Sequence, residues 1–547
     1  MRVLRVALDV PLATLFDYLE DADSVAQPGD RVAVPFGRGE RVGVVMEAAQ
    51  YSRVEPARLK PIRRVLDDAP RLPADWLALM RLLSGYYQRP TGETAAGALP
   101  PRLRSLKPLP KRRDGAADAA GGAAFVPGHR PNAAQALAIA RIGAALGKFR
   151  AFLLHGVTGS GKTEIYLHLI ARVLGRGGQA LVLVPEIGLT PQLEARFRHA
   201  FPDGRIAILH SALEAGARTH AWLDAARGDA GIVLGTRLAV LAPLPRLALV
   251  VVDEEHDTSF KQQEGLRYSG RDAAVLRAKL AGCPAVLGTA TPSLETWFNC
   301  RAGRYERLAL PERAVPGAVL PSVRTVDLSA HPAVQGFAAP LLEAIGGRLE
   351  RREQSLVFIN RRGYAPVLAC EACGWASGCE RCTAHLVLHA ADRRLRCHHC
   401  GAEARIPRAC PTCGNPDLRP VGRGTQRVEE TLAGRFPGAR IARIDRDSAR
   451  RRGALERALA AAHRGEADIL VGTQLLAKGH DFPALTLVCV LGADSALLST
   501  DYRAAERLFA TLDQVAGRSG RRTRRRRARR PAKAWGEVTS WTRWRSM

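Results

Sequence analysis

The sequence predicts an α/β protein with two parallel-sheet units, a smaller β-rich unit at the N-terminus and a cysteine-rich insertion. Three observations lead to this fold class. Short apolar runs alternate with helical patterns in two separate stretches, as in the buried parallel sheets of α/β proteins. The first hundred residues alternate apolar and polar positions between turn signals. Eight of the 11 cysteines form four C-x-x-C pairs between Cys370 and Cys413.

Length and composition limit the possible classes of protein. A chain of 547 residues is too long for one hydrophobic core, so we expect three or four domains. The start, "MRVLRVALDV", lacks the apolar run of a signal peptide, and no stretch reaches the length of a membrane span. We therefore expect a cytoplasmic protein without a membrane partner, whose paired cysteines bind metal because thiols stay reduced there.

The net charge of +28 indicates a polyanionic partner. The charge stays strongly positive when the arginine-rich end of the chain is set aside. A high arginine content without any partner is the alternative. Nucleic acid is the expected partner, although charge alone does not distinguish DNA from RNA.

Residues 1–100 are predicted to form the β-rich unit. Its strand candidates "RVALDV", "DRVAVPF" and "RVGVVME" are separated by the turn signals "QPGD" and "GRGE", and the helical stretch "ADWLALMRLLSGYYQ" follows. Residues 101–130 are rich in Pro, Arg, Gly and Ala, which is typical of a linker.

Two α/β units follow the linker. The first occupies residues 131–310, with strands at "AFLLHG", "ALVLVPE", "IVLGT", "LALVVVDEEH" and "AVLGTATP". The second is divided into residues 311–369 and 414–521, with strands such as "SLVFINRR" and "LTLVCVLGAD". The cysteine-rich insertion, residues 370–413, separates its two parts.

A phosphate loop is predicted at G-x-x-x-x-G-K-T, between an apolar strand and a helix. Its glycines let backbone N–H groups surround phosphates, the lysine reaches the β and γ oxygens, and the threonine can bind magnesium. A chance match in a glycine-rich loop is the alternative, and the flanking strand and helix argue against it. The candidate nucleotide-binding residues are Gly156, Val157, Thr158, Gly159, Ser160, Gly161, Lys162 and Thr163.

Acidic residues end a later strand, "LALVVVDEEH". Asp253 and Glu254 at that position can hold magnesium and orient the attacking water. An acidic cap on the next helix is the alternative. The presence of a phosphate loop in the same unit favours the magnesium role over that cap. We expect His256 to be a positioning hydrogen-bond partner that links the site to the polynucleotide, with a metal ligand as the alternative.

The ordered series "GSGKTE", "LVPEIGLTPQ", "GTR", "DEEH", "GTATPS", "VGTQLLAKGHDFP" and "QVAGRSGR" resembles a superfamily two helicase. More narrowly, "DEEHDTSFKQQEGLRYSGRD", "FINRRGYAP" and the eight cysteines resemble the family of primosomal protein N′ (PriA), the replication-restart helicases. The resemblance covers roughly residues 1 to 521. It implies two RecA-like helicase lobes, an inserted two-zinc cysteine-rich subdomain and a small β-rich N-terminal DNA-binding domain.

The resemblance also implies residue roles. Gln135 would read adenine, with a random linker-adjacent glutamine as the alternative. Lys162 and Thr163 would bind phosphate and Mg²⁺, and Asp253 and Glu254 would supply magnesium contact and water activation. The arginines expected to reach the γ-phosphate from the second lobe are Arg518 and Arg521.

Residues at two places in the chain, most of them aromatic, are candidate DNA contacts. In "LFDYL", Phe16, Asp17 and Tyr18 match the family's pocket for the three-prime end of the nascent strand, with a turn-capping aspartate as the alternative. After "DEEH", Phe260 and Tyr268 could stack on bases, and ordinary packing explains them equally well.

Eight thiolates suit two tetrahedral Zn²⁺ ions per chain. The inner four, with nearly the spacing of a zinc ribbon, are Cys379, Cys382, Cys397 and Cys400. The outer four, left for the second ion, are Cys370, Cys373, Cys410 and Cys413. The resemblance to the family implies the same nested arrangement. Sequential pairing is the alternative, and an iron–sulfur cluster fits four neat pairs less well.

The function implied by the resemblance is an ATP-dependent three-prime to five-prime DNA helicase. It would recognise stalled replication forks and D-loops and start primosome assembly. Its partners would be single-stranded and forked DNA, single-strand binding protein, primosome components and the replicative helicase loader, and the protein would act as a monomer. A fork-binding primosome scaffold with a weak or dispensable motor is the main alternative, and a double-strand translocase is a third.

The sequence departs from the family pattern in two places. Linker-like residues occupy the interval where the family has a winged-helix domain. Residues 522–547 are basic and contain Trp535, Trp541 and Trp544 without aliphatic periodicity. We expect a disordered tail that arises from a shifted reading frame, with a genuine DNA-binding arm as the alternative. In that case the second lobe would lack a closing strand.

Overall fold

The computed structural model divides the chain into two compact units. Unit 1 comprises Met1–Gly156 and Gly161–Pro311, and unit 2 comprises Val157–Ser160 and Glu312–Met547. The residues outside the described part are 1, 21–24, 110–123, 186–190, 316, 319, 329, 360–366, 371, 383–384, 390–392, 398, 422–424, 446–453, 474–475, 477–481, 498–500, 520–536 and 543–547.

Unit 1 begins with a five-stranded antiparallel sheet of order β2-β1-β4-β3-β5. Side chains alternate between the faces of a strand, so Leu4, Val6 and Leu8 of β1 enter the same small core together. The strands are β1 (Val3–Leu8), β2 (Phe16–Leu19), β3 (Arg31–Phe36), β4 (Gly39–Ala49) and β5 (Arg64–Leu66).

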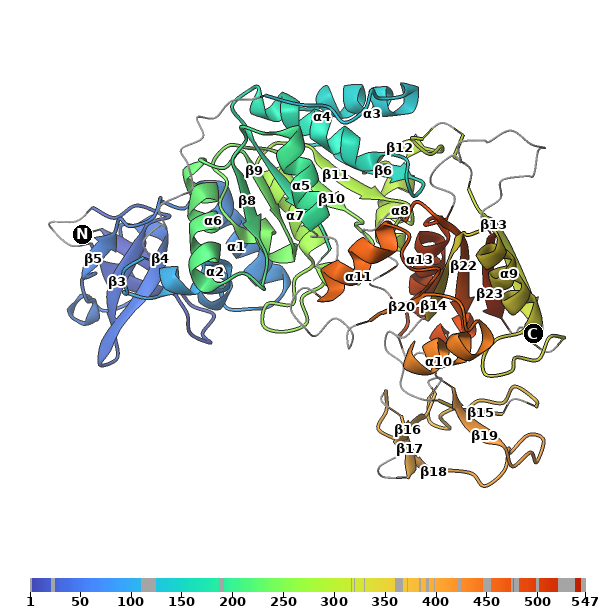
Figure 1. Cartoon of the computed structure of the whole chain (residues 1–547). Helices are drawn as coiled ribbons and strands as arrows, with labels where there is room; N and C mark the ends of the chain where they lie inside the picture. The colour runs from blue at the N-terminus through green and yellow to red at the C-terminus, as the bar shows by residue number, and fades with distance from the viewer. Residues whose placement is uncertain are drawn as a thin grey trace. The chain divides into compact units, whose positions relative to one another are not determined.

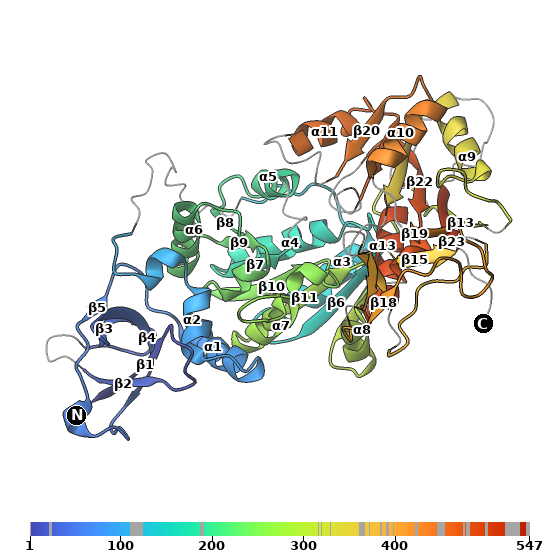
Figure 2. The ribbon, with the colours of Figure 1, turned by 90° about the horizontal axis from the view of Figure 1, so that it is seen from below.

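Helices α1 (Ala74–Tyr86) and α2 (Thr91–Ala98) lie between this sheet and the larger sheet of unit 1 (Figure 2). The apolar face of α1 shares one continuous core with that larger sheet and its helices. Trp76 is fully buried, and its Nε1–H donates a hydrogen bond of 2.7 Å to the Leu241 carbonyl. The N-terminal sheet is thereby joined to the first lobe by a packed interface.

The larger sheet of unit 1, the first lobe, has seven parallel strands in the order β12-β6-β11-β10-β7-β9-β8. This lobe is the cyan to yellow-green part of Figure 1. Both faces are covered: Leu249 and Val251 of β10 pack with α4, whereas Val250 and Val252 pack with α7. The strands are β6 (Ala151–Gly156), β7 (Gln179–Leu183), β8 (Ile206–Leu209), β9 (Ile232–Gly235), β10 (Leu247–Asp253), β11 (Ala285–Thr289) and β12 (Glu306–Leu310). The helices are α3 (Ala133–Gly143), α4 (Lys162–Leu174), α5 (Pro191–Ala200), α6 (Ala215–Arg227), α7 (Gly270–Leu280) and α8 (Leu294–Arg301).

Unit 2, the second lobe, contains a six-stranded parallel sheet of order β13-β23-β22-β14-β21-β20. Two separate apolar cores cover its faces. The strands are β13 (Ser322–Asp327), β14 (Gln354–Ile359), β20 (Ile441–Ile444), β21 (Ile469–Gly472), β22 (Leu485–Leu491) and β23 (Glu537–Thr542). The helices are α9 (Ala339–Glu350), α10 (Thr425–Arg435), α11 (Ala454–His463) and α13 (Ala504–Ala516).

Strand β23 differs from the expectation of a disordered tail without a closing strand. Its backbone pairs in parallel with both β13 and β22. Pairing through backbone N–H and C=O groups does not require a repeating apolar side-chain pattern, which explains why the sequence pattern did not reveal it. The frame-shift interpretation of residues 522–547 concerns the origin of this segment and stays a prediction.

The cysteine-rich insertion forms its own five-stranded antiparallel sheet, of order β18-β17-β16-β15-β19. Its strands are β15 (Val367–Cys370), β16 (Val387–His389), β17 (Arg394–Arg396), β18 (Glu403–Arg405) and β19 (Leu418–Val421). The predicted α/β fold class, with two parallel-sheet lobes, this insertion and a β-rich N-terminal unit, is confirmed. Within the described residues, no helix is both long and apolar enough to cross a membrane.

Candidate nucleotide site and metal clusters

The predicted phosphate loop connects the end of β6 to the start of α4. Gly159 and Gly161 have φ angles of +80° and +81°, which L side chains rarely adopt, so the two glycines allow the tight turn. The helix begins at Lys162, whose Nζ donates to the Gly156 carbonyl at 3.0 Å. Backbone N–H groups at such a helix start form a ready site for an anion.

Glu164, directly after the loop, is a site residue that sequence reasoning missed. It is buried, and its carboxylate accepts hydrogen bonds from the backbone N–H groups of Gly128 (2.9 Å) and His129 (3.4 Å). Arg196 also donates to it at 3.3 Å. Glu164 thus fixes the segment that leads into α3 against the helix of the phosphate loop.

Gln135 lies on α3, next to that segment. Its backbone N–H donates to the Asn132 side chain, and its Oε1 accepts from the Asn132 backbone N–H, both at 2.9 Å. This reciprocal pair is a capping box that starts the helix, and "NAAQ" was the sequence signal for it. Gln135 therefore has a local structural role, and no contact with a nucleotide is needed to explain its burial.

The acidic motif lies at the end of β10, where the strand has brought Asp253 close to α4. Tyr166, which is buried, donates a hydrogen bond of 2.9 Å from its hydroxyl to Asp253 Oδ1. Burial raises the pKa of Asp253 above its ordinary value, and the charge of Glu254 raises it further, whereas Lys162 opposes the shift. Burial also raises the pKa of Tyr166 well above its ordinary value, so the phenol stays protonated and acts as the donor.

Glu254 and His256 follow in the same turn. Glu254 has a φ of +48°, a left-handed backbone conformation that is uncommon outside glycine and that often marks a functional constraint. His256 Nδ1 lies 2.7 Å from Thr289 Oγ1 and 3.7 Å from Glu254 Oε2. The histidine thus links the acidic motif to the end of β11, and its expected link to the polynucleotide stays a prediction.

Glu255 is the second residue that sequence reasoning missed. Its buried carboxylate accepts hydrogen bonds from the Ser293 backbone N–H (2.7 Å), the Ser293 hydroxyl (2.9 Å), the Thr296 hydroxyl (2.9 Å) and Arg271 (3.3 Å). These donors lie on α7 and at the start of α8. Glu255 therefore connects the acidic motif with the segment "GTATPS" and the start of α7.

For Phe260 and Tyr268 the structure favours ordinary packing over base stacking. Their exposed fractions are 2% and 4%, and the Tyr268 hydroxyl donates to the Arg237 carbonyl at 3.1 Å. The sequence could not distinguish the two alternatives, because an aromatic residue in a predicted loop can be either buried or exposed.

The N-terminal candidates lie on β2, on two faces of the strand. Tyr18 is part of the core, and its hydroxyl donates to the Pro35 carbonyl at 3.0 Å, while Phe16 packs edge-on against Phe36. Asp17 lies on the opposite face, where it accepts a hydrogen bond from the Ser52 hydroxyl (2.6 Å). Tyr18 is thus held in the interior, and Asp17 is the more accessible polar group.

Arg518 lies just after α13, and its backbone N–H donates to the Val515 carbonyl at 3.1 Å. Only 8% of its surface is exposed. Arg521, the other expected arginine, lies outside the described residues.

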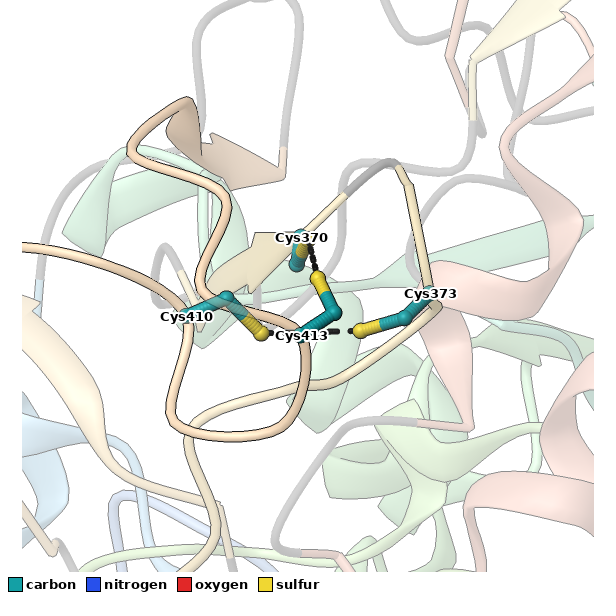
Figure 3. Close-up of side chains that lie close together, drawn as sticks. All are labelled: Cys370, Cys373, Cys410 and Cys413. Atoms are coloured by element: carbon teal, nitrogen blue, oxygen red, sulfur yellow. Dashed lines mark hydrogen bonds between the residues drawn. The ribbon is translucent and has the colours of Figure 1, made fainter.

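The eight paired cysteines form two clusters in the nested arrangement, not the sequential one. Within each cluster the ligand atoms all lie within 4.8 Å of one another. The outer set, on two loops that face each other, is Cys370, Cys373, Cys410 and Cys413 (Figure 3). The inner set is Cys379, Cys382, Cys397 and Cys400.

The sulfur spacing suits a metal. Sγ–Sγ distances of 3.5–3.6 Å occur in both clusters, close to the edge of about 3.8 Å expected for a tetrahedron with Zn–S bonds of about 2.3 Å. The chemistry of both donor sets therefore fits zinc.

Four families match successive parts of the chain. They are the 3′DNA-binding domain (3′BD) at residues 5–100, the DEAD/DEAH box helicase at 132–297, the PriA DNA helicase Cys-rich region (CRR) domain at 379–405 and the helicase conserved C-terminal domain at 422–523. Together with the phosphate loop and the two parallel-sheet lobes, these matches define an ATP-dependent DNA helicase.

Known relatives identify the family within that class. The replication restart protein PriA of Haemophilus influenzae is 39% identical over 95% of this chain and 80% of its own length. Replication restart protein PriA of Treponema pallidum is 37% identical over 95% of this chain and 78% of its own length. The Bacillus subtilis relative of the same name is 44% identical over 68% of this chain, which spans only 46% of that protein. The chain belongs to the family of the replication restart protein PriA.

Similar solved structures are more distant. RecG bound to a three-way DNA junction has a TM-score of 0.43 at 14% identity, covering 86% of this chain and 50% of RecG. The helicase MrfA bound to DNA has a TM-score of 0.44 at 13% identity, covering 76% and 49%.

Proposed function

We propose that this helicase recognises stalled replication forks and D-loops, moves three-prime to five-prime along single-stranded DNA and starts primosome assembly. The observation that carries the proposal is the packed joint between the N-terminal sheet and the first lobe. Trp76 and the shared apolar core tie a 3′DNA-binding domain to the lobe whose strand β6 and helix α4 flank the phosphate loop. Recognition of a nascent three-prime end would then be transmitted directly to the motor.

The nucleotide chemistry follows from the residues at the ends of β6 and β10. Lys162 and the backbone N–H groups of the loop would bind the phosphates of ATP. Glu254 would orient the attacking water, Arg518 and Arg521 would stabilise charge on the γ-phosphate, and Gln135 would read adenine. Because its side chain also caps α3, Gln135 would position that helix at the same time.

A magnesium ion fits the donor set next to Lys162. Thr163 and Asp253 supply a hydroxyl and a carboxylate, which are oxygen ligands of the kind that Mg²⁺ prefers. When bound, the ion would neutralise charge on the β- and γ-phosphate oxygens. The residues of the chain would supply the rest. Lys162 would supply positive charge, Glu254 would orient the attacking water, and Tyr166 would hold the Asp253 carboxylate in place.

The remaining proposals concern partners. Phe16, Asp17 and Tyr18 would form the pocket for the three-prime end, with the buried Tyr18 shaping it from inside and Asp17 accepting a hydrogen bond from a base edge or the terminal hydroxyl. Single-strand binding protein, primosome components and the replicative helicase loader are the expected protein partners, and the protein would work as a monomer in the cytoplasm.

The test is strand displacement on synthetic forks that differ only in the presence of a nascent three-prime end. We expect faster unwinding of the lagging-strand arm when that end is present, and an Asp17→Ala variant should lose the difference. Equal rates on the two forks would contradict fork recognition through the N-terminal domain. Tight fork binding without any ATP-dependent displacement would instead support a scaffold with a dispensable motor.

A further inference from the structure

Tyr166 is a buried polar side chain whose position the general nucleotide chemistry leaves unexplained. It lies one helical turn after Lys162 on α4, so both residues occupy the same face of the helix. Lys162 is directed at the loop, and the Tyr166 hydroxyl reaches the carboxylate of Asp253 at 2.9 Å. One helix face therefore serves both the phosphate site and the acidic strand end.

The sheet is shaped to admit this hydroxyl. Asp253 of β10 and Gly288 of β11 are register partners in adjacent parallel strands. A Cβ atom on Gly288 would lie 1.7 Å from the Tyr166 hydroxyl oxygen and 3.4 Å from Asp253 Oδ1. The absence of a side chain at Gly288 is thus what allows the phenol to lie against Asp253.

We propose that Tyr166 is a positioning residue that holds Asp253 for magnesium, with Gly288 providing the space for its hydroxyl. The inference rests on the proposed magnesium site. By donating to Oδ1, Tyr166 restrains the orientation of the Asp253 carboxylate, which also accepts a hydrogen bond from the Glu254 backbone N–H, and so holds it ready for the ion. Groups that hydrogen-bond a metal-binding carboxylate typically contribute about 10- to 100-fold to metal affinity.

The competing explanation is that Tyr166 is only a core residue and that Asp253 satisfies its buried hydroxyl. The two explanations differ in what a Tyr166→Phe variant does. Phenylalanine keeps the ring and its packing and removes only the hydroxyl. A packing role predicts a change in thermal stability alone, whereas a positioning role predicts a change in metal-dependent nucleotide binding.

The experiment measures ADP affinity of the full chain by calorimetry, once with EDTA and once with millimolar Mg²⁺. For Tyr166→Phe we expect the metal-free Kd to stay within about twofold and the gain in affinity on adding Mg²⁺ to fall about tenfold. Tyr268→Phe is the matched control, because it also loses one buried hydroxyl bond in the same lobe, to a backbone carbonyl away from Asp253. Its magnesium gain should equal that of the wild type.

The possible outcomes are distinguishable. If wild-type protein gains no ADP affinity from Mg²⁺, the proposed magnesium site fails. If the wild type gains affinity and Tyr166→Phe gains as much, the positioning role of Tyr166 is overturned while the magnesium site stands. Equal losses in Tyr166→Phe and Tyr268→Phe would also overturn it, because they would indicate a general loosening of the lobe.

A Gly288→Ala variant tests the second half of the inference. Alone, it should reduce the magnesium gain because its methyl group displaces the phenol. In a Tyr166→Phe background the same substitution should cost clearly less, since the displaced hydroxyl is already missing. Additive losses would show that Gly288 acts independently of Tyr166.

Discussion

At the scale of single residues, the site separates groups that would touch nucleotide from groups that hold them in place. Lys162 belongs to the first kind, because its Nζ ends beside the loop that would bind phosphate. Glu164, Glu255 and Tyr166 belong to the second, since each is buried and bonded to protein groups from other segments. Substitutions at the two kinds of position should therefore have different effects on ATP hydrolysis and on stability.

Lys162→Ala should abolish catalysis and spare DNA binding. We expect DNA-stimulated ATP hydrolysis to fall at least about 100-fold, because a cation at the transferring phosphate is lost. Affinity for forked DNA should stay within about threefold, since most of the positive charge lies elsewhere. Coupled ATPase assays and fluorescence anisotropy measure the two quantities. Lys148→Ala, an exposed lysine of the same lobe, should change neither, and normal turnover in Lys162→Ala would refute the site assignment.

Glu255→Gln should destabilise the first lobe, whereas Glu254→Gln should not. The Glu255 carboxylate is buried and accepts hydrogen bonds from Ser293, Thr296 and Arg271. Removing its charge leaves a largely buried arginine with weaker compensation, which costs about 2–4 kcal/mol. Glu254 is partly exposed, so its substitution should lower ATP hydrolysis without lowering the midpoint of urea unfolding. Equal stability of the two variants would contradict the structural role of Glu255.

At the scale of elements, the packing of α1 determines whether the N-terminal sheet behaves as an independent module. Its side chains belong to the same apolar core as the sheet of the first lobe. The helical stretch was evident in the sequence, but its partner was not. The burial of Trp76 depends on a carbonyl 165 residues away, and no local pattern encodes that distance.

Trp76→Ala should loosen this joint. Loss of a fully buried indole costs about 3–5 kcal/mol in unfolding free energy, and limited proteolysis should begin to release the N-terminal sheet from the first lobe. Trp76→Phe should cost about 1–2 kcal/mol, mainly the lost N–H bond. Tyr86→Ala, at an exposed position of the same helix, is the control. Wild-type proteolysis of Trp76→Ala would indicate that α1 does not hold the two sheets together.

The zinc clusters are the second test at this scale. The purified chain should contain two zinc ions. The Cys379→Ser variant should contain one, because Cys379 belongs to only one cluster and the other cluster, which includes Cys373, stays intact. We expect Cys379→Ser to reduce unwinding more than single-strand-stimulated ATPase, since the insertion forms a sheet of its own and contributes no residue to the phosphate loop. Metal analysis and the two activity assays measure this, and Cys300→Ser, outside both clusters, should behave as wild type. A single ion in the wild-type chain, or equal loss of both activities, would contradict the expectation.

At the scale of the whole molecule, the net charge of +28 predicts how DNA binding responds to salt. Neutralised phosphates release counterions, so the association constant for single-stranded DNA should fall by about one to two orders of magnitude between roughly 50 and 200 mM salt. Lys162→Ala should have the same slope of log affinity against log salt, because the phosphate loop is proposed to bind nucleotide. Salt-independent binding would mean that the positive charge does not contact the DNA backbone.

The sequence alone determined those features whose chemistry is local. The phosphate loop needs a strand, a glycine-rich turn and a helix start within a few residues, and all three are contiguous from β6 to α4. The parallel-sheet lobes follow from short apolar strands, and the presence of two metal clusters follows from four pairs of cysteines. The choice between nested and sequential pairing required the structure. The capping box formed by Asn132 and Gln135 is equally local and was visible in "NAAQ". Sequence analysis interpreted Gln135 as an adenine-binding residue instead.

Which distant groups meet depends on the tertiary structure. Tyr166 and Asp253 are 87 residues apart, and Glu164 and Gly128 are 36 residues apart, so their hydrogen bonds depend on the strand order of the completed sheet. The burial of Phe260 and Tyr268 and the place of β23 between two strands were likewise decided by packing and backbone pairing. The physical reason is that spacing along the chain specifies local geometry, whereas burial and long-range hydrogen bonds exist only once the sheet has brought separate segments together.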